Sequence, residues 1–233
     1  MEERVLLVTG SRKGIGRHLS EYYAKAGWRV IGCSREPAQD NLINYRHVCL
    51  DVEDEAAVVR MMSDIRVREG RLDAVVNSAG VSAMNHALLT PASTVRRILG
   101  CNVVGTFNVA REAAKLMSRA RSGRIINLST VAVPLDLEGE AAYAASKAAV
   151  ESLTRTMARE FASLGITVNA LGPTPIQTDL IRGVPQDKLA ALVRRQPIAR
   201  MGSMRDVVNV VAFFLNPDSD FITGQTVYLG GVS

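Results

Sequence analysis

The 233-residue sequence contains few cysteines and few histidines, and it lacks long apolar runs. No apolar run approaches the roughly 18 residues that a membrane-spanning helix needs. The opening residues do not resemble a signal peptide, because charged residues lead directly into a strand-like run. The cysteines and histidines show no spacing typical of a metal or redox site. They are Cys33, Cys49, Cys101, His18, His47 and His86. We therefore expect a cytoplasmic protein with reduced thiols and no bound metal.

The sequence also lacks internal repeats, low-complexity segments and linker-like stretches. Its length suits a single α/β domain over residues 1–233, and its 47% of apolar residues can fill a large core. The net charge is +5, but the basic residues are scattered among acidic ones. This pattern does not favour nucleic-acid binding, whereas a positive field suits an acidic substrate or carrier partner.

One stretch near the amino terminus combines a strand, a glycine-rich turn and the start of a helix. Residues 5–8 are apolar and predict a buried strand, and apolar residues recur at helical spacing from position 19. Glycine lets the backbone approach an anion closely, and the N–H groups of a new helix favour negative charge. We predict that the turn between them binds a phosphate group. The turn residues are Gly10, Ser11, Arg12, Lys13, Gly14, Ile15 and Gly16.

Strand and helix patterns then alternate along the chain. Further strands are predicted at residues 29–33, 45–50, 72–77, 124–129, 166–171 and 225–229. Helices are predicted at residues 53–69, 90–120 and 141–164, with a break near 101–102 in the second of them. Such alternation predicts an α/β fold with a doubly wound parallel sheet and helices on both faces. Ligands of such sheets bind at the carboxyl ends of the strands.

The end of the second strand should face the adenine ribose of a dinucleotide. An acidic residue there would bind the 2′-hydroxyl of NAD, but this chain has Ser34 and Arg35, with Lys13 in the glycine turn. Two cations without a carboxylate suit a 2′-phosphate, which predicts NADP(H) as the cofactor. Asp51 follows the third strand and is placed to accept from the adenine amino group. Its alternative role is to cap the helix that starts near Glu53.

Tyr143 and Lys147 are four residues apart on a predicted helix and share one face. The preceding strand ends in the hydroxyl residues Ser129 and Thr130. A hydroxyl at that strand end and a phenol on the next helix can converge on one carbonyl oxygen. We expect Lys147 to lower the pKa of Tyr143 from ~10, which would make it a proton donor for carbonyl reduction.

Together these motifs resemble the short-chain dehydrogenase/reductase family over essentially the whole chain, and 3-oxoacyl-carrier-protein reductases and related carbonyl reductases within it. The matching segments are Thr9-Gly10-x-x-x-Gly14-Ile15-Gly16, Asp51-Val52, Asn77-Ser78-Ala79-Gly80, Asn102, Tyr143-x-x-x-Lys147 and Pro173-x-x-Ile176-x-Thr178. The resemblance implies a Rossmann fold with the strand order 3-2-1-4-5-6-7. It also implies a homotetramer formed through the helices near residues 102–120 and 141–164.

The resemblance further implies roles for single residues. Asn102 would support a water-linked proton relay, and Lys147 would hold the nicotinamide ribose. Ile176 and Thr178 would hold the nicotinamide carboxamide. The other implied cofactor contacts are Val52, Asn77, Ala79, Gly80 and Pro173.

This chain departs from the family pattern at several positions. The family serine stands thirteen residues before the tyrosine, and that position here is Thr130. Side chains alternate along a strand, so we expect Ser129 to point away from the site. Thr174 replaces a glycine after the sixth strand, which disfavours a positive φ there. Two further departures are Ser78, in place of an asparagine, and Gly230, in place of an acidic residue.

The substrate is the least determined part. The segment at residues 172–200 is expected to cover it and contains Leu180, Ile181, Val184, Leu189 and Leu192. These residues suit an acyl substrate, so a 3-oxoacyl thioester is our first hypothesis, although they could equally pack the cover against the core. Arg121 matches one of two basic residues that carrier-protein reductases present, whereas Leu164 stands at the other. The alternatives are a dehydrogenase of a sugar, polyol or other small alcohol, and a non-catalytic NADP-binding regulator.

Overall fold

A computed structural model describes residues 3–38, 42–178, 181 and 184–232. Seven parallel strands form one sheet in the order β3-β2-β1-β4-β5-β6-β7, which confirms the predicted fold class. The strands are β1 Val5–Thr9, β2 Arg29–Ser34, β3 Tyr45–Cys49, β4 Ala74–Asn77, β5 Gly123–Leu128, β6 Ile166–Gly172 and β7 Thr226–Tyr228. The order reverses its direction between β1 and β4, which places a ligand site at the carboxyl ends of these two strands.

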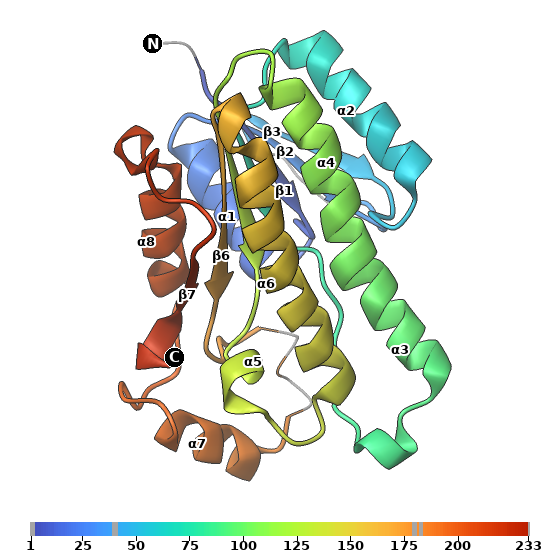
Figure 1. Cartoon of the computed structure of the whole chain (residues 1–233), viewed down its shortest axis with the longest axis vertical. Coiled ribbons are helices and arrows are strands. Elements are labelled where there is room, and N and C mark those ends of the chain that lie inside the picture. The colour runs from blue at the N-terminus through green and yellow to red at the C-terminus, as the bar shows by residue number, and fades with distance from the viewer. Residues whose placement is uncertain (1–2, 39–41, 179–180, 182–183, 233) are drawn as a thin grey trace.

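Helices cover both faces of the sheet (Figure 1). One apolar core lies between the sheet and α2 Glu55–Glu69, α4 Gly105–Met117 and α6 Ala141–Phe161. The other core lies between the sheet and α1 Gly14–Lys25 and α8 Met204–Leu215. The strands at the centre of the sheet are apolar on both sides because each side meets a helix layer.

The predicted break in the second long helix is a π-helical turn. The chain passes without interruption from α3 Ala92–Leu99 through the π turn Gly100–Val104 into α4. A π turn inserts one extra residue into a helix and often marks a functional position. Asn102 lies in this turn, so the helix changes its geometry at a predicted site residue.

Two short helices lie beyond the carboxyl ends of the strands, near the bottom of Figure 1. They are α5 Ala132–Leu135, which the sequence patterns did not predict, and α7 Gln186–Arg194. Short 3₁₀ turns complete the described structure at Ala87–Leu89, Ala162–Leu164, Pro217–Ser219 and Leu229–Gly231. Among the described residues, no helix is long and apolar enough to cross a membrane.

Candidate active site

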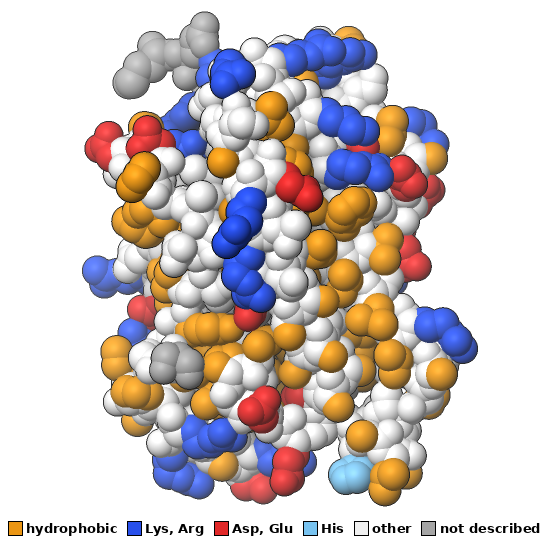
Figure 2. Space-filling view, in the orientation of Figure 1, with side chains coloured by type: hydrophobic (Ala, Val, Ile, Leu, Met, Phe, Trp, Pro, Cys, Tyr) orange, Lys and Arg blue, Asp and Glu red, His pale blue; other side chains and the backbone are white. Residues whose placement is uncertain are grey.

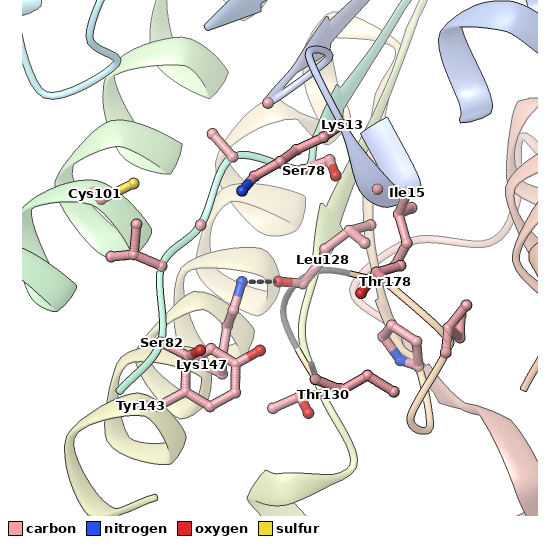
Figure 3. Close-up of a pocket in the computed structure, with 18 of the residues that line it drawn as sticks. Lys13, Ile15, Ser78, Ser82, Cys101, Leu128, Thr130, Tyr143, Lys147 and Thr178 are labelled. Carbon is pink, nitrogen blue, oxygen red and sulfur yellow. Dashed lines mark hydrogen bonds between the residues drawn. The ribbon is translucent and has the colours of Figure 1, made fainter. Parts of the chain in front are cut away.

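A cavity of about 610 Å³ lies at the carboxyl ends of the central strands. Its lining comes from the glycine turn, from the ends of β2, β3, β4 and β5, from α6 and from the chain after β6 (Figure 3). We call the part lined by Ser34, Arg35 and Asp51 the adenosine end, and the part lined by Thr130, Tyr143 and Lys147 the reaction end. The position agrees with the one expected for a ligand of a doubly wound sheet.

The glycine turn brings the backbone close to this cavity. Gly10 and Gly14 have φ values of 68° and 60°, which side chains rarely allow. A Cβ on Gly10 would lie 2.8 Å from Ala79 Cα, and a Cβ on Gly16 would lie 2.5 Å from Gly10 O. These two glycines therefore let α1 and the end of β4 pack against the turn. The first helical turn of α1 contains no acidic residue, which leaves its amino end suited to an anion.

Three cations line the cavity toward its adenosine end: Arg12, Lys13 and Arg35, which we call the cationic cluster. Arg12 Nη1 pairs with Glu36 Oε2 at 2.9 Å. Asp51 also lines the cavity, and its Oδ1 accepts from the Glu53 amide at 3.0 Å. The alternative role of Asp51 as a helix cap is wrong, because α2 is capped by Asp54, which accepts from the Ala57 amide at 3.0 Å.

Thr130, Tyr143 and Lys147 meet at the reaction end, as the sequence predicts (Figure 3). Lys147 Nζ donates to the carbonyl oxygen of Leu128 at 2.7 Å and lies 6.0 Å from the centre of the Tyr143 ring. Thr130 Oγ1 accepts from the Ala132 amide at 3.2 Å. The short unpredicted helix α5 thus begins at the amide that orients the Thr130 hydroxyl.

Ser129 also lines the cavity, but its hydroxyl is directed to α6 and not to the groups of the reaction end. It is buried, and its hydroxyl donates to Glu151 Oε1 on α6. The same carboxylate oxygen accepts from Tyr228 Oη on β7 at 2.6 Å. Glu151 therefore ties the ends of β5 and β7 to the helix that carries Tyr143 and Lys147.

The predicted lowering of the Tyr143 pKa is wrong for this structure. Burial and the nearby Glu140 raise the pKa of Tyr143 to about 12, and the interaction with the Thr130 hydroxyl opposes them. Burial also lowers the pKa of Lys147 to about 8, which weakens the positive charge that was expected to act on the phenol. An anionic ligand in the cavity would favour the charged form of Lys147 again.

Glu140 is a site residue that the sequence reasoning missed. It lines the cavity one helical turn before Tyr143, and its side chain is buried. Its Oε2 has no hydrogen-bond partner among the described residues, and burial raises the pKa of the carboxyl to about 7. The three-residue spacing from Tyr143 was the available signal, because residues at that spacing share a helix face.

Asn102 binds backbone and side-chain partners rather than lining the cavity. Its Oδ1 accepts from the Val81 amide at 2.8 Å, and its Nδ2 donates to Val81 O at 3.0 Å and to Ser146 Oγ at 2.9 Å. Its backbone oxygen accepts from Thr106 Oγ1 at 2.7 Å. Asn102 thus clamps the chain after β4 to α6, and its role in a water relay stays a prediction.

The departures at Thr174 and Gly230 lie side by side. Thr174 is buried and is not among the described residues with a positive φ. A Cβ on Gly230 would lie 2.9 Å from Thr174 Cγ2 and 2.6 Å from Gln196 Oε1. The glycine at 230 therefore makes room for the extra side chain at 174, and the loop after β6 keeps a conformation that threonine tolerates.

The remaining predicted residues fall into two groups. Gly80, Val52 and Ala79 line the cavity, as do the residues after β6, which are Pro173, Ile176 and Thr178. Ser11, Gly16 and Asn77 are buried beside it without lining it. Asn77 Nδ2 donates to Asn127 Oδ1 at 2.9 Å within the sheet.

The apolar residues expected to cover the substrate do line the cavity. These are Ile181, Val184, Leu189 and Leu192, whereas Leu180 lies outside the described residues. Arg121 lies elsewhere, because it precedes the amino end of β5 whereas the cavity is at the carboxyl end. Its Nη2 donates to Ser163 O at 2.8 Å.

Comparisons with known proteins agree with the family resemblance. A family profile described as "Enoyl-(Acyl carrier protein) reductase" matches residues 10–232. The 3-oxoacyl-[acyl-carrier-protein] reductase of Escherichia coli K12 is 32% identical over 99% of this chain and 97% of its own length. The reductase of the same name from Staphylococcus aureus is 34% identical over 97% and 96% of the two chains.

Solved structures with the same fold include a sugar dehydrogenase and a protein with bound NADP. The aldohexose dehydrogenase of Thermoplasma acidophilum superposes with a TM-score of 0.89, at 29% identity and over 99% of this chain and 94% of that one. The NADP-bound structure of ElxO superposes with a TM-score of 0.90, at 28% identity and over 99% and 98% of the two chains.

Proposed function

We propose a specific activity for this chain, which belongs to the short-chain dehydrogenase/reductase family: NADP(H)-dependent reduction of a carbonyl group, with a 3-oxoacyl thioester as the first substrate to test. As a member of that family it is an oxidoreductase that acts on CH–OH groups with a nicotinamide cofactor. The proposal rests on one observation. Thr130, Tyr143 and Lys147 meet at one end of the cavity, and the other end holds the cationic cluster.

The residues of the cavity fit a dinucleotide phosphate. The glycine turn leaves the backbone of Gly10 and Gly14 open to the cavity beside the amino end of α1, which suits a pyrophosphate. The cationic cluster suits a 2′-phosphate, and the NADP-bound ElxO structure supports the same cofactor. When bound, the cofactor supplies a hydride to the carbonyl carbon.

The protein residues manage the charge that develops on the carbonyl oxygen. Tyr143 gives its phenolic proton to that oxygen, and the Thr130 hydroxyl donates to the same oxygen and holds it in place. Lys147, in its charged form, lowers the free energy of the phenolate that remains. The proton then returns to Tyr143 through Lys147 and water, which Asn102 supports by clamping the neighbouring backbone.

A 3-oxoacyl thioester is supported by the names of the sequence relatives and by the apolar cover. Arg121 does not line the cavity, so a CoA or N-acetylcysteamine thioester is a more direct first substrate than an acyl carrier protein. The test is NADPH oxidation with acetoacetyl-CoA beside a simple ketone and an aldose, each of which has a carbonyl group to reduce. We expect the thioester to give the highest kcat/KM; a higher value for the aldose would replace the substrate proposal.

A second candidate is the oxidation of a sugar or polyol. The unpartnered carboxyl of Glu140 could accept hydrogen bonds from substrate hydroxyl groups, and the aldohexose dehydrogenase shares the fold. An assay of NADP⁺ reduction with an aldose and a polyol separates the two candidates, because turnover there favours the sugar or polyol dehydrogenase. Absence of turnover with every substrate, alongside tight NADPH binding, would favour the non-catalytic regulator instead.

We also propose a homotetramer formed through the long helices. Exposed apolar side chains lie along α3, the π turn and α4, at Leu99, Val104 and Phe107, and orange side chains gather over this part of Figure 2. Such a patch is more typical of a protein interface than of a free surface. Light scattering should give a mass about four times 25.2 kDa; a fully active monomer would contradict the proposal.

A further inference from the structure

Beneath the adenosine end, side chains from the glycine turn and from β2 and β3 form one chain of hydrogen bonds. Ser11 Oγ lies 2.9 Å from Tyr45 Oη, which lies 2.9 Å from His47 Nδ1. On the other side of the ring, His47 Nε2 lies 3.0 Å from Ser34 Oγ and 3.2 Å from the carbonyl oxygen of Glu36. This series of hydrogen bonds therefore connects the two segments that carry the cationic cluster.

A glycine in β2 makes room for these hydrogen-bonded side chains. Gly32 is paired with His47 in the parallel register, and Val30 is paired with Tyr45. Tyr45 and His47 are two residues apart, so they lie on the same face of the sheet. A Cβ on Gly32 would overlap both Tyr45 Oη and Ser11 Oγ. Any other residue at position 32 would separate the turn from β3.

The hydrogen-bond directions assign the proton on His47. Ser34 Oγ donates to Glu36 O at 2.7 Å, so Ser34 Oγ accepts from His47 Nε2–H. The opposite nitrogen, Nδ1, lies 2.9 Å from Tyr45 Oη and 3.4 Å from Ser11 Oγ. Ser11 Oγ lies 2.9 Å from Tyr45 Oη and donates to the carbonyl oxygen of Cys33 at 3.5 Å. Both ring nitrogens are engaged, which fixes the orientation of the imidazole.

We propose that His47 is a positioning residue that makes the cofactor site selective for an adenosine 2′-phosphate. The inference rests on the proposed NADP(H) function. His47 holds both Ser34 and Glu36, so it fixes the turn on which Arg35 stands. Because His47 Nε2–H also reaches Glu36 O, the Ser34 hydroxyl can turn its hydrogen toward a phosphate without leaving that carbonyl unpaired. NAD carries only a hydroxyl at this position and gains much less from the arrangement.

The test compares the binding of NADPH and NADH to the full chain by nicotinamide fluorescence. His47→Leu removes both ring nitrogens, and we expect it to raise the Kd for NADPH about tenfold while the Kd for NADH changes less than twofold. His47→Gln retains an N–H near the position of Nε2, and we expect it to restore NADPH binding to within about threefold of the wild type. Competition by adenosine 2′,5′-bisphosphate against 5′-AMP isolates the phosphate itself.

Two further variants keep the result interpretable. His86→Leu makes the same change at an exposed histidine outside the cavity and should leave both affinities unchanged. Tyr45→Phe removes the phenol that backs Nδ1 and should shift the NADPH affinity in the same direction as His47→Leu, by a smaller factor. It also provides a second variant if His47→Leu does not fold.

The outcomes separate this inference from the proposed function. Equal losses for NADPH and NADH in His47→Leu, or no loss for either, would overturn the role of His47 while NADP(H) preference stands. A wild type that binds NADH as tightly as NADPH would overturn the cofactor proposal and this inference together. Failure of His47→Gln to recover NADPH binding would also contradict the assigned Nε2–H contact.

Discussion

The two ends of the cavity differ in how their polar groups are paired. At the adenosine end, Ser34 and His47 have hydrogen-bond partners on neighbouring strands, and Asp51 accepts from the backbone. At the reaction end, Glu140 Oε2 has no partner among the described residues. Burial raises the pKa of Tyr143 to about 12 and lowers the pKa of Lys147 to about 8.

We attribute this difference to the two functions proposed for these ends, which are cofactor binding and proton transfer. Binding requires groups that already stand in the geometry of the complex, because ordering them later would reduce the affinity. Proton transfer requires groups whose protonation can change, and burial shifts the pKa of Tyr143 upward and that of Lys147 downward. The protonation of the groups at the reaction end therefore depends more strongly on a bound ligand.

The largest expected effect tests the reaction end alone. Tyr143→Phe removes the proton donor and keeps the ring, so we expect kcat to fall by about 10³-fold or more. The Kd for NADPH should stay within about twofold, because the adenosine end keeps its contacts. Steady-state kinetics and fluorescence titration measure the two quantities, and a parallel loss of NADPH binding would show that the ends are not separable.

The next effect distinguishes two adjacent hydroxyl groups. Thr130→Val removes the donor to the carbonyl oxygen and should lower kcat by about 10²–10³-fold. Thr130→Ser removes only the methyl group, so it should remain active and accept bulkier ketones. Ser129→Ala serves as the matched control and should keep kcat within about threefold, because the Ser129 hydroxyl is already engaged in donating to Glu151. The reverse ranking would assign the reacting hydroxyl to Ser129.

A change at the adenosine end should alter affinity and leave chemistry intact. Arg35→Asp replaces a cation of the cationic cluster by an anion, and we expect the Kd for NADPH to rise about ten- to hundredfold, with NADH preferred. The kcat with saturating cofactor should change little. Arg60→Asp makes the same charge change on the exposed side of α2 and should have no effect on either Kd.

The smallest effect concerns stability at the reaction end. The pKa of Glu140 is raised to about 7, so the folded protein binds more protons than the unfolded chain between about pH 4.5 and 7. Stability from this group is therefore full at low pH and decreases as pH rises through that window. Glu140→Gln should gain about 1–3 kcal/mol of stability relative to the wild type between pH 5 and pH 8.

Thermal unfolding at the two pH values measures this difference. The variant Glu138→Gln makes the same substitution at an exposed residue nearby and serves as the control. A Glu140→Gln variant whose stability difference from the wild type is the same at both pH values would show that the carboxyl is not held neutral by burial.

Much of the site could be predicted because its signals are local. The glycines at 10, 14 and 16 and the four-residue spacing from Tyr143 to Lys147 each depend on one strand end or one helix. The register that assigns Thr130 to the cavity depends only on alternation along β5. Glu140 and His47 escaped prediction because their roles depend on burial and on partners from other elements, which spacing along the chain does not reveal.

The sequence by itself determined the alternation of strands and helices, the position of the cavity and the side of it on which the cations stand, because periodicity, glycines and strand ends are properties of short segments. The strand order followed from the family resemblance and not from these patterns. Only the tertiary structure decided the pKa shifts of Tyr143 and Lys147, the fit of Thr174 against Gly230 and the series of hydrogen bonds from Ser11 to Glu36. Each of these depends on how much water is excluded and on which distant side chains meet, and both follow from packing rather than from local pattern.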